Sequence, residues 1–140
     1  MSRRGSIHII MNAPNPNPTV YDLLGGATEL RRLVDQFYDL MDSVPDYAPL
    51  RAIHAPDLNP MREKLTDWMS GWLGGPALYD ARPDATCIGH AHAAFTIDAA
   101  MRDQWVECMN RALDDCGTSE EVQARLRPPL AALAEFLRNH

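Results

Sequence analysis

Long apolar runs are absent from this chain of 140 residues. A helix that crosses a bilayer needs about 18 or more apolar residues in succession, and no stretch comes near that length, so we expect no membrane span. Residues 7–11, which follow the basic opening Met1-Ser2-Arg3-Arg4, are interrupted by His8 and are too few for the core of a signal peptide. The sequence therefore predicts a cytoplasmic protein without a membrane partner.

Cysteine and positive charge are also scarce. The three cysteines, Cys87, Cys108 and Cys116, cannot all pair within one chain and are too few for a disulfide scaffold, so we expect reduced thiols. The 13 basic residues are outnumbered by 19 acidic ones, which gives a formal net charge of −6. Because the basic residues are scattered, the sequence argues against nucleic acid as a partner and favours small molecules or proteins.

Three familiar catalytic patterns are missing as well. The sequence contains no Ser-His-Asp arrangement, no glycine loop that could cradle a phosphate and no His-Glu-x-x-His motif. We interpret the two double glycines, Gly25-Gly26 and Gly74-Gly75, as helix ends, where glycine adopts positive φ angles at no steric cost.

The length and the 46% hydrophobic content suit one domain with a single core and one site. Proline alternates with asparagine through residues 12–19, which prevents a helix and offers little apolar surface to bury. We therefore expect a flexible N-terminal tail over residues 1–19 and one folded domain over residues 20–140.

Apolar residues in that domain recur with the period of 3.6 that is typical of helices, so the sequence predicts an all-α fold. A short helix should run over residues 20–24 and end at Gly25-Gly26. A second helix should be capped by Thr28, bury Phe37 and Tyr38 along one face and end at Pro45. Because prolines recur through residues 45–60, we expect that segment to be irregular.

The remaining pattern predicts three further helices. The third should be capped by Asn59 and end at residues 74–76, and the loop after it should contain one helical turn just before His92. Asp98 should cap the fourth, which ends near Gly117. Residues 118–121 form a capping-box pattern for the last helix, which Pro128-Pro129 should interrupt before its apolar face continues through Leu130, Leu133, Phe136 and Leu137.

His92 stands at the edge of an apolar helical seam without a visible catalytic partner. Two interpretations fit its position alone: a ligand of haem iron, or a core histidine whose ring nitrogens are satisfied by hydrogen bonds.

Five motifs around it follow one another in a particular order. Together they resemble the truncated haemoglobins of group II, over residues 20–113. The matching segments are Tyr21-Asp22-Leu23-Leu24-Gly25-Gly26, then Phe37-Tyr38, then Trp72-Leu73-Gly74-Gly75-Pro76 with Tyr79, then His92-Ala93-Ala94-Phe95 with Ile97, and finally Arg102-Asp103-Gln104-Trp105.

This resemblance implies a truncated-globin fold, a two-over-two helical sandwich around haem b. It implies that His92 is the proximal iron ligand and that Tyr38 and Trp105 are hydrogen-bond donors to the ligand on the distal side. His54 falls where the family places an aromatic residue or histidine at the distal edge of the haem. It could donate to the ligand, bind Tyr38 or coordinate the iron as a sixth ligand.

The resemblance also implies a wall around the cofactor. Leu65 would lie over the iron, Met61 at a ligand gate, and Trp68 in the haem wall or core. Lys64 suits a haem propionate, although a solvated lysine fits its position equally well. Tyr79 and Phe95 complete the implied cofactor-binding set.

One segment departs from the family pattern. Many members carry basic residues and a His-Pro pair in the seven positions before the proximal histidine, where this chain has residues 85–91 without them. The usual propionate contacts are therefore in doubt, and His90 becomes a rival iron ligand. We prefer His92 because it keeps Phe95, Ile97 and Trp105 in register.

Three functions remain for this site. The first is reversible binding of oxygen, nitric oxide or carbon monoxide by a monomer or homodimer, for scavenging, sensing or redox chemistry. The second is nitric oxide dioxygenation or peroxide reduction, which would need an external reductase because the sequence shows no reductase domain. The third is a zinc site made from Cys87, His90 and His92, completed by Cys108 or Cys116.

Overall fold

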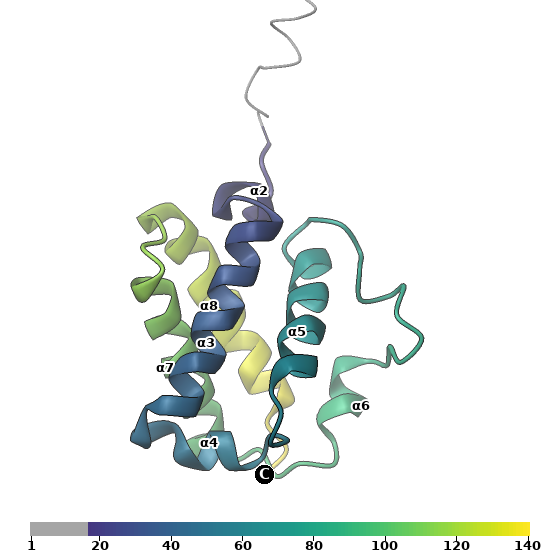
Figure 1. Ribbon diagram of the computed structural model, residues 1–140, viewed down its shortest axis with the longest axis vertical. Helices are drawn as coiled ribbons and strands as arrows, with labels where there is room; N and C mark the ends of the chain where they lie inside the picture. Colours follow the sequence, from purple (N-terminus) through teal and green to yellow (C-terminus); the bar gives the residue numbers. More distant parts are fainter. Residues whose placement is uncertain (1–16) are drawn as a thin grey trace, which may run out of the picture.

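The computed structural model describes residues 17–140, and the regular structure of this part of the chain is entirely helical (Figure 1). The predicted tail, residues 1–19, falls mostly outside the described residues and stays a prediction. Thr19, its last residue, belongs to the folded part, because its side chain caps the first described helix, α2 (Val20–Leu24).

The fold consists of two antiparallel helix pairs. Helix α3 (Ala27–Ser43) runs against α5 (Asn59–Trp72), and α7 (Ala99–Asp115) runs against α8 (Glu120–Leu137) (Figure 1). The two pairs meet where α3 packs on α7. This arrangement confirms the predicted all-α, two-over-two architecture.

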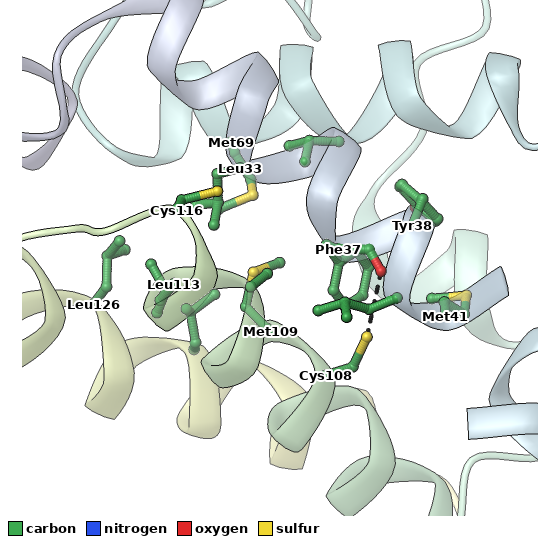
Figure 2. Close-up of a cluster of buried hydrophobic side chains, with 14 of the residues drawn as sticks. Leu33, Phe37, Tyr38, Met41, Met69, Cys108, Met109, Leu113, Cys116 and Leu126 are labelled. Atoms are coloured by element: carbon green, nitrogen blue, oxygen red, sulfur yellow. Dashed lines mark hydrogen bonds between the residues drawn. The ribbon is translucent and has the colours of Figure 1, made fainter. Parts of the chain in front are cut away.

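The core forms where the apolar faces of these helices meet. Leu30, Leu33, Val34 and Phe37 of α3 recur at helical spacing and are completely buried. Burying each side chain of this size stabilises the fold by about 1.5–3 kcal/mol. Figure 2 shows Leu33 and Phe37 beside buried residues of α7, among which are Cys108, Met109 and Leu113.

All three cysteines are free, as predicted. The Cys108 thiol donates to the Phe37 carbonyl at 3.3 Å, so one polar contact joins α3 to α7 inside the core (Figure 2). Burial raises the pKa of Cys108 to about 12, so this thiol stays protonated. Cys116 is buried and Cys87 is exposed.

Two predicted caps were wrong by one or two residues. Helix α3 is preceded by Gly26, whose φ of 83° turns the chain without a side-chain cap, and Thr28 lies inside the helix. Asn59 is the first residue of α5 rather than its cap, and its N–H donates to the Asp57 carboxylate at 3.0 Å. Asp98 caps α7 as predicted, accepting from the N–H of Met101.

The segment predicted to be irregular contains two short helices. A 3-10 helix covers Pro45–Tyr47, and α4 covers Ala48–Ala52. Each has a proline in its first two positions, where the missing N–H would have had no helical partner. Prolines here start helices, and the segment buries Tyr47 and Leu50.

The predicted interruption of α8 was also wrong. The helix begins after the cap Ser119 and continues through Pro128-Pro129 to Leu137. The carbonyls that lose a donor belong to Ala124 and Arg125, both exposed, so water can replace the missing N–H groups. Phe136, predicted to lie on the apolar face of this helix, is instead 70% exposed.

The long connection after α5 leads to α6 (Ile88–His92), which confirms the predicted helical turn before His92. The connection starts at Gly74, whose φ is 95°, and Gly75 lies against the ring of Tyr21. The N–H of Tyr21 donates to the Leu73 carbonyl at 3.0 Å. The second double glycine therefore lets the end of α5 approach α2 closely.

None of the helices within residues 17–140 has the length and apolar character needed to span a membrane.

Gly75→Ala should lower the free energy of unfolding by about 1–3 kcal/mol, because a Cβ there would lie 2.5 Å from Cδ1 of Tyr21. Gly71→Ala is the control. Its Cβ would lie 3.4 Å from the Ala77 Cα, and alanine is favoured over glycine inside a helix by up to about 1 kcal/mol. Urea unfolding of both variants measures the difference, and equal stabilities would contradict the close approach.

Candidate functional site

Four aromatic rings from three parts of the chain form a connected row. The Tyr38 ring meets His54 edge to face at 6.0 Å between centroids and meets Phe37 at 5.0 Å. Phe37 in turn meets Trp105 of α7 at 5.6 Å. The structure therefore brings together Tyr38, His54 and Trp105, the three residues predicted for the distal side.

The hydroxyl of Tyr38 is buried without a hydrogen-bond partner among residues 17–140. The residue is 2% exposed. Burial raises the pKa of the Tyr38 phenol, so it stays protonated and keeps its donor. A buried hydroxyl without a partner costs about 1–3 kcal/mol, so this group is placed to donate to something outside the protein chain.

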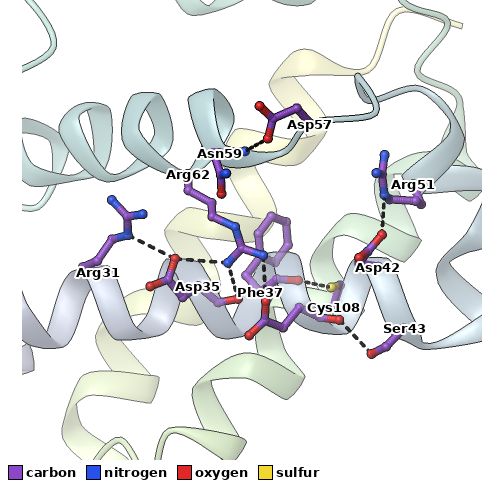
Figure 3. A network of polar contacts seen from close by, with 11 residues as sticks. Arg31, Asp35, Phe37, Asp42, Ser43, Arg51, Asp57, Asn59, Arg62 and Cys108 are labelled. Atoms are coloured by element: carbon purple, nitrogen blue, oxygen red, sulfur yellow. Dashed lines mark hydrogen bonds and ion pairs between the residues drawn. The ribbon is translucent and has the colours of Figure 1, made fainter.

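Arg62 of α5 lies over the Tyr38 ring, with its guanidinium carbon 5.8 Å from the ring centroid. One amino group of Arg62 donates to the carbonyl and the carboxylate of Asp35, at 3.0 and 3.1 Å, and the other donates to Asp39 at 2.6 Å (Figure 3). This network fixes α5 against α3 at Tyr38. The positive charge of Arg62 partly opposes the burial that raises the pKa of Tyr38.

His54 is half-buried, and its Nδ1 lies 2.8 Å from the Leu50 carbonyl. Since a carbonyl only accepts, Nδ1 carries the proton. Burial is the main cause of a lowered pKa for His54, and the neighbouring Arg51 and His92 lower it further. The neutral ring therefore presents an unprotonated Nε2, which can accept a hydrogen bond or bind a metal but cannot donate.

His92 shows the same local geometry. Its Nδ1 lies 2.7 Å from the Ile88 carbonyl, which fixes the proton on that nitrogen and leaves a lone pair on Nε2. The rival ligand, His90, is exposed, and its ring makes no hydrogen bond with residues 17–140. The local geometry therefore favours His92 over His90 as a metal ligand.

Large apolar side chains complete the surroundings. Met61, Leu65 and Trp68 of α5 are partly buried against the core, and Trp68 stacks on Trp72 with centroids 5.2 Å apart. Phe95, just beyond α6, is 41% exposed.

These groups fit the haem that the resemblance to group II truncated haemoglobins implies. The set includes two imidazoles with fixed tautomers, His54 and His92, apolar side chains from α5 and one buried phenol without a hydrogen-bond partner among residues 17–140. The indole of Trp105 adds an N–H that has no hydrogen-bond partner among the described residues. A flat apolar cofactor with a metal at its centre requires this combination of a nitrogen ligand, apolar walls and polar donors.

Two residues predicted to bind the cofactor, Lys64 and Tyr79, have partners in the loop after α5. The Lys64 ammonium pairs with Asp84 at 3.1 Å, so a propionate would have to share it. The Tyr79 hydroxyl donates to the Thr86 carbonyl at 3.2 Å and accepts from the Thr86 N–H at 3.3 Å. Both side chains hold the loop in place, and their contact with a cofactor stays a prediction.

Sequence reasoning missed Arg62 and Arg82. Arg82 binds Asp67 of α5 at 2.8 Å and Asp84 at 3.1 Å, which ties the loop to that helix. An isolated arginine gives no periodic signal. The one available hint was the spacing of Asp35 and Asp39, four residues apart on a helix, which suits a shared cationic partner.

The zinc alternative was wrong for the described part of the chain. No group of three or more histidine, cysteine or acidic side chains there is arranged to hold a metal. Cys108 lies in the core, where its thiol donates to Phe37, and Cys116 lies 3.8 Å from the Arg32 carbonyl.

Comparisons with known proteins identify relatives of the chain. The sequence profile of the family described as "Bacterial-like globin" matches residues 19–139. The group 2 truncated hemoglobin YjbI of Bacillus subtilis is 31% identical over 114 residues, which cover 81% of this chain and 84% of that protein.

Two solved structures share the fold. The group II 2-on-2 hemoglobin of Agrobacterium tumefaciens superimposes with a TM-score of 0.84 at 32% identity, covering 91% of this chain and 98% of the other. The cold-adapted truncated hemoglobin of Pseudoalteromonas haloplanktis TAC125 gives a TM-score of 0.83 at 33% identity, covering 88% and 99%.

Arg62→Met should lower the free energy of unfolding by about 1–2 kcal/mol, because it leaves Asp35 and Asp39 without their shared partner in a part-buried network. Arg31→Met is the matched control. It removes another ion pair with Asp35, but one between side chains 43% and 40% exposed, so we expect less than about 0.5 kcal/mol. Urea unfolding in low salt compares the two, and an equal loss would contradict a special role for Arg62.

Proposed function

The chain belongs to the bacterial-like globin family, and we propose that in this member His92 ligates the haem iron while Tyr38 and Trp105 donate hydrogen bonds to a diatomic ligand. Haem is the cofactor of this family, and small diatomic ligands such as oxygen bind to it. When bound, the haem supplies a ferrous iron that takes such a ligand reversibly. The buried, unpaired hydroxyl of Tyr38 is the observation that carries the proposal.

His92 is suited to the iron because its ring is fixed. The hydrogen bond from Nδ1 to the Ile88 carbonyl sets the ring orientation and directs the Nε2 lone pair away from the α6 backbone. Such a bond also raises the basicity of the nitrogen that binds a metal. His90 lacks a partner of this kind, which supports His92 in the proximal role.

Tyr38 and Trp105 are suited to the ligand because each has an unused donor. A ligand that accepts from the Tyr38 hydroxyl gives this group the partner that it lacks among residues 17–140. Release of the ligand leaves the hydroxyl unpaired again, at a cost of about 1–3 kcal/mol. Slow release favours scavenging, sensing or redox chemistry over oxygen delivery.

His54 has a different part in this proposal from the two donors. In its neutral form, with Nδ1 bonded to Leu50, it has a lone pair on Nε2 and no proton there. It can accept from Tyr38 or coordinate the iron, but it donates to a ligand only after protonation. The distal donors are therefore Tyr38 and Trp105.

The enzymatic alternative, nitric oxide dioxygenation or peroxide reduction, would use the same donors to polarise an O–O bond. Turnover would also need electrons from a separate reductase. Sustained conversion of nitric oxide to nitrate with a reductase present would support this alternative.

Tyr38→Phe and Trp105→Phe should each speed oxygen dissociation from the ferrous protein about 5- to 30-fold, the equivalent of about 1–2 kcal/mol of lost hydrogen bonding. Tyr21→Phe is the control, because Tyr21 lies in α2 against Gly75 and its hydroxyl makes no hydrogen bond with the described residues. Stopped-flow measurement gives the rates. Unchanged rates in both pocket variants would remove the distal donors from the proposal.

His92→Gly should abolish the iron–histidine stretching band of the ferrous haem, and added imidazole should restore an axial nitrogen ligand. His90→Ala should leave the band unchanged. Resonance Raman and absorption spectra of the three proteins make the comparison. Loss of the band in His90→Ala alone would assign the iron to His90 instead.

A further inference from the structure

The segment that carries His92 packs against α8 near the end of that helix. Helix α6 contains no buried residue, and α8 is the helix on which it packs. A Cβ built on Gly89 would lie 3.9 Å from the exposed ring of Phe136. The position of the proximal segment therefore depends on contacts with the last residues of the chain.

Asn139 makes three hydrogen bonds to residues 95–97. Its side-chain oxygen accepts from the Ile97 N–H at 2.8 Å, and its side-chain nitrogen donates to the Phe95 carbonyl at 2.8 Å. Its own N–H donates to the Ile97 carbonyl at 2.8 Å. Only one orientation of the amide satisfies both side-chain bonds, since one partner donates and the other accepts.

Phe95 links Asn139 to His92, because its backbone makes a hydrogen bond to each of them. The N–H of Phe95 donates to the His92 carbonyl at 3.1 Å, while the carbonyl of Phe95 is held by Asn139. At the other end of this chain of contacts, the His92 ring is held by Ile88. Ile97 is 8% exposed, so its N–H would lack a partner without Asn139.

We infer that Asn139 is a positioning residue for His92: by fixing Phe95 and Ile97, it sets how the imidazole meets the iron. This inference rests on the proposed proximal role of His92. In this role Asn139 needs no contact with the cofactor or the ligand. It acts through the backbone that follows His92, although Asn139 itself lies 42 residues from Ile97 in the sequence.

The test is Asn139→Ala in the haem-loaded protein, read by resonance Raman of the ferrous form. We expect the iron–histidine stretching band to shift and broaden while haem content is retained. Hydrogen exchange of the Ile97 amide should become about tenfold faster, because one hydrogen bond to it is lost. Arg125→Ala is the control, since the side chain of Arg125 pairs with Glu121 in the first half of α8, away from Asn139.

Asn139→Asp keeps the acceptor for the Ile97 N–H but replaces the donor to Phe95 with an oxygen. We expect a band shift in the same direction as for Asn139→Ala, and this variant decides the matter if Asn139→Ala fails to fold or hold haem. An unchanged band in either folded variant, with only a lower melting temperature, would overturn the inference while His92→Gly still abolished the band. If His92→Gly kept the band, the proposed function itself would fail.

Discussion

The burial of one face of α3 between two other helices is the constraint on which the rest of the structure depends. Leu33, Val34 and Phe37 are completely buried, and α3 packs on α5 and on α7. Tyr38 follows Phe37 on the same turn. The packing that stabilises the fold therefore also fixes the phenol, and Arg62 adds an ionic contact at the same level of the helix. The side chain of Tyr38 is held in place because it belongs to the core.

The helices could be predicted wherever their stability is local. The helical period of the apolar residues predicted α3. Asp98 predicted the start of α7, because a cap acts within one turn. Two of the errors involve prolines. The free energy that Pro128 costs the helix depends on whether its missing N–H leaves a buried carbonyl unpaired. Whether Pro49 starts or breaks a helix depends on its position in the helical turn. Both are properties of the folded chain that the sequence does not display.

The candidate site divides in the same way. Tyr38, His92 and Trp105 could be named from the order of their motifs, and the structure brings Tyr38 and Trp105 into one aromatic row. The residues that support them could not be named. Arg62 lies 27 residues from Asp35, and Asn139 lies 42 residues from Ile97. A polar pair between distant segments leaves no period in the sequence, so only the fold reveals it.

The two prolines inside α8 give this helix an uneven stiffness. Two successive N–H groups are missing there, so the helix has fewer internal hydrogen bonds to resist bending at Pro128-Pro129 than elsewhere along its length. Val122 and Leu126 before the prolines and Leu130 and Ala134 beyond them are buried, while Phe136 near the end of the helix is exposed and the chain then leads to Asn139. Side-chain packing on both sides of the prolines therefore limits any bend there, and with it the movement of the contacts that Phe136 and Asn139 make with residues 89–97.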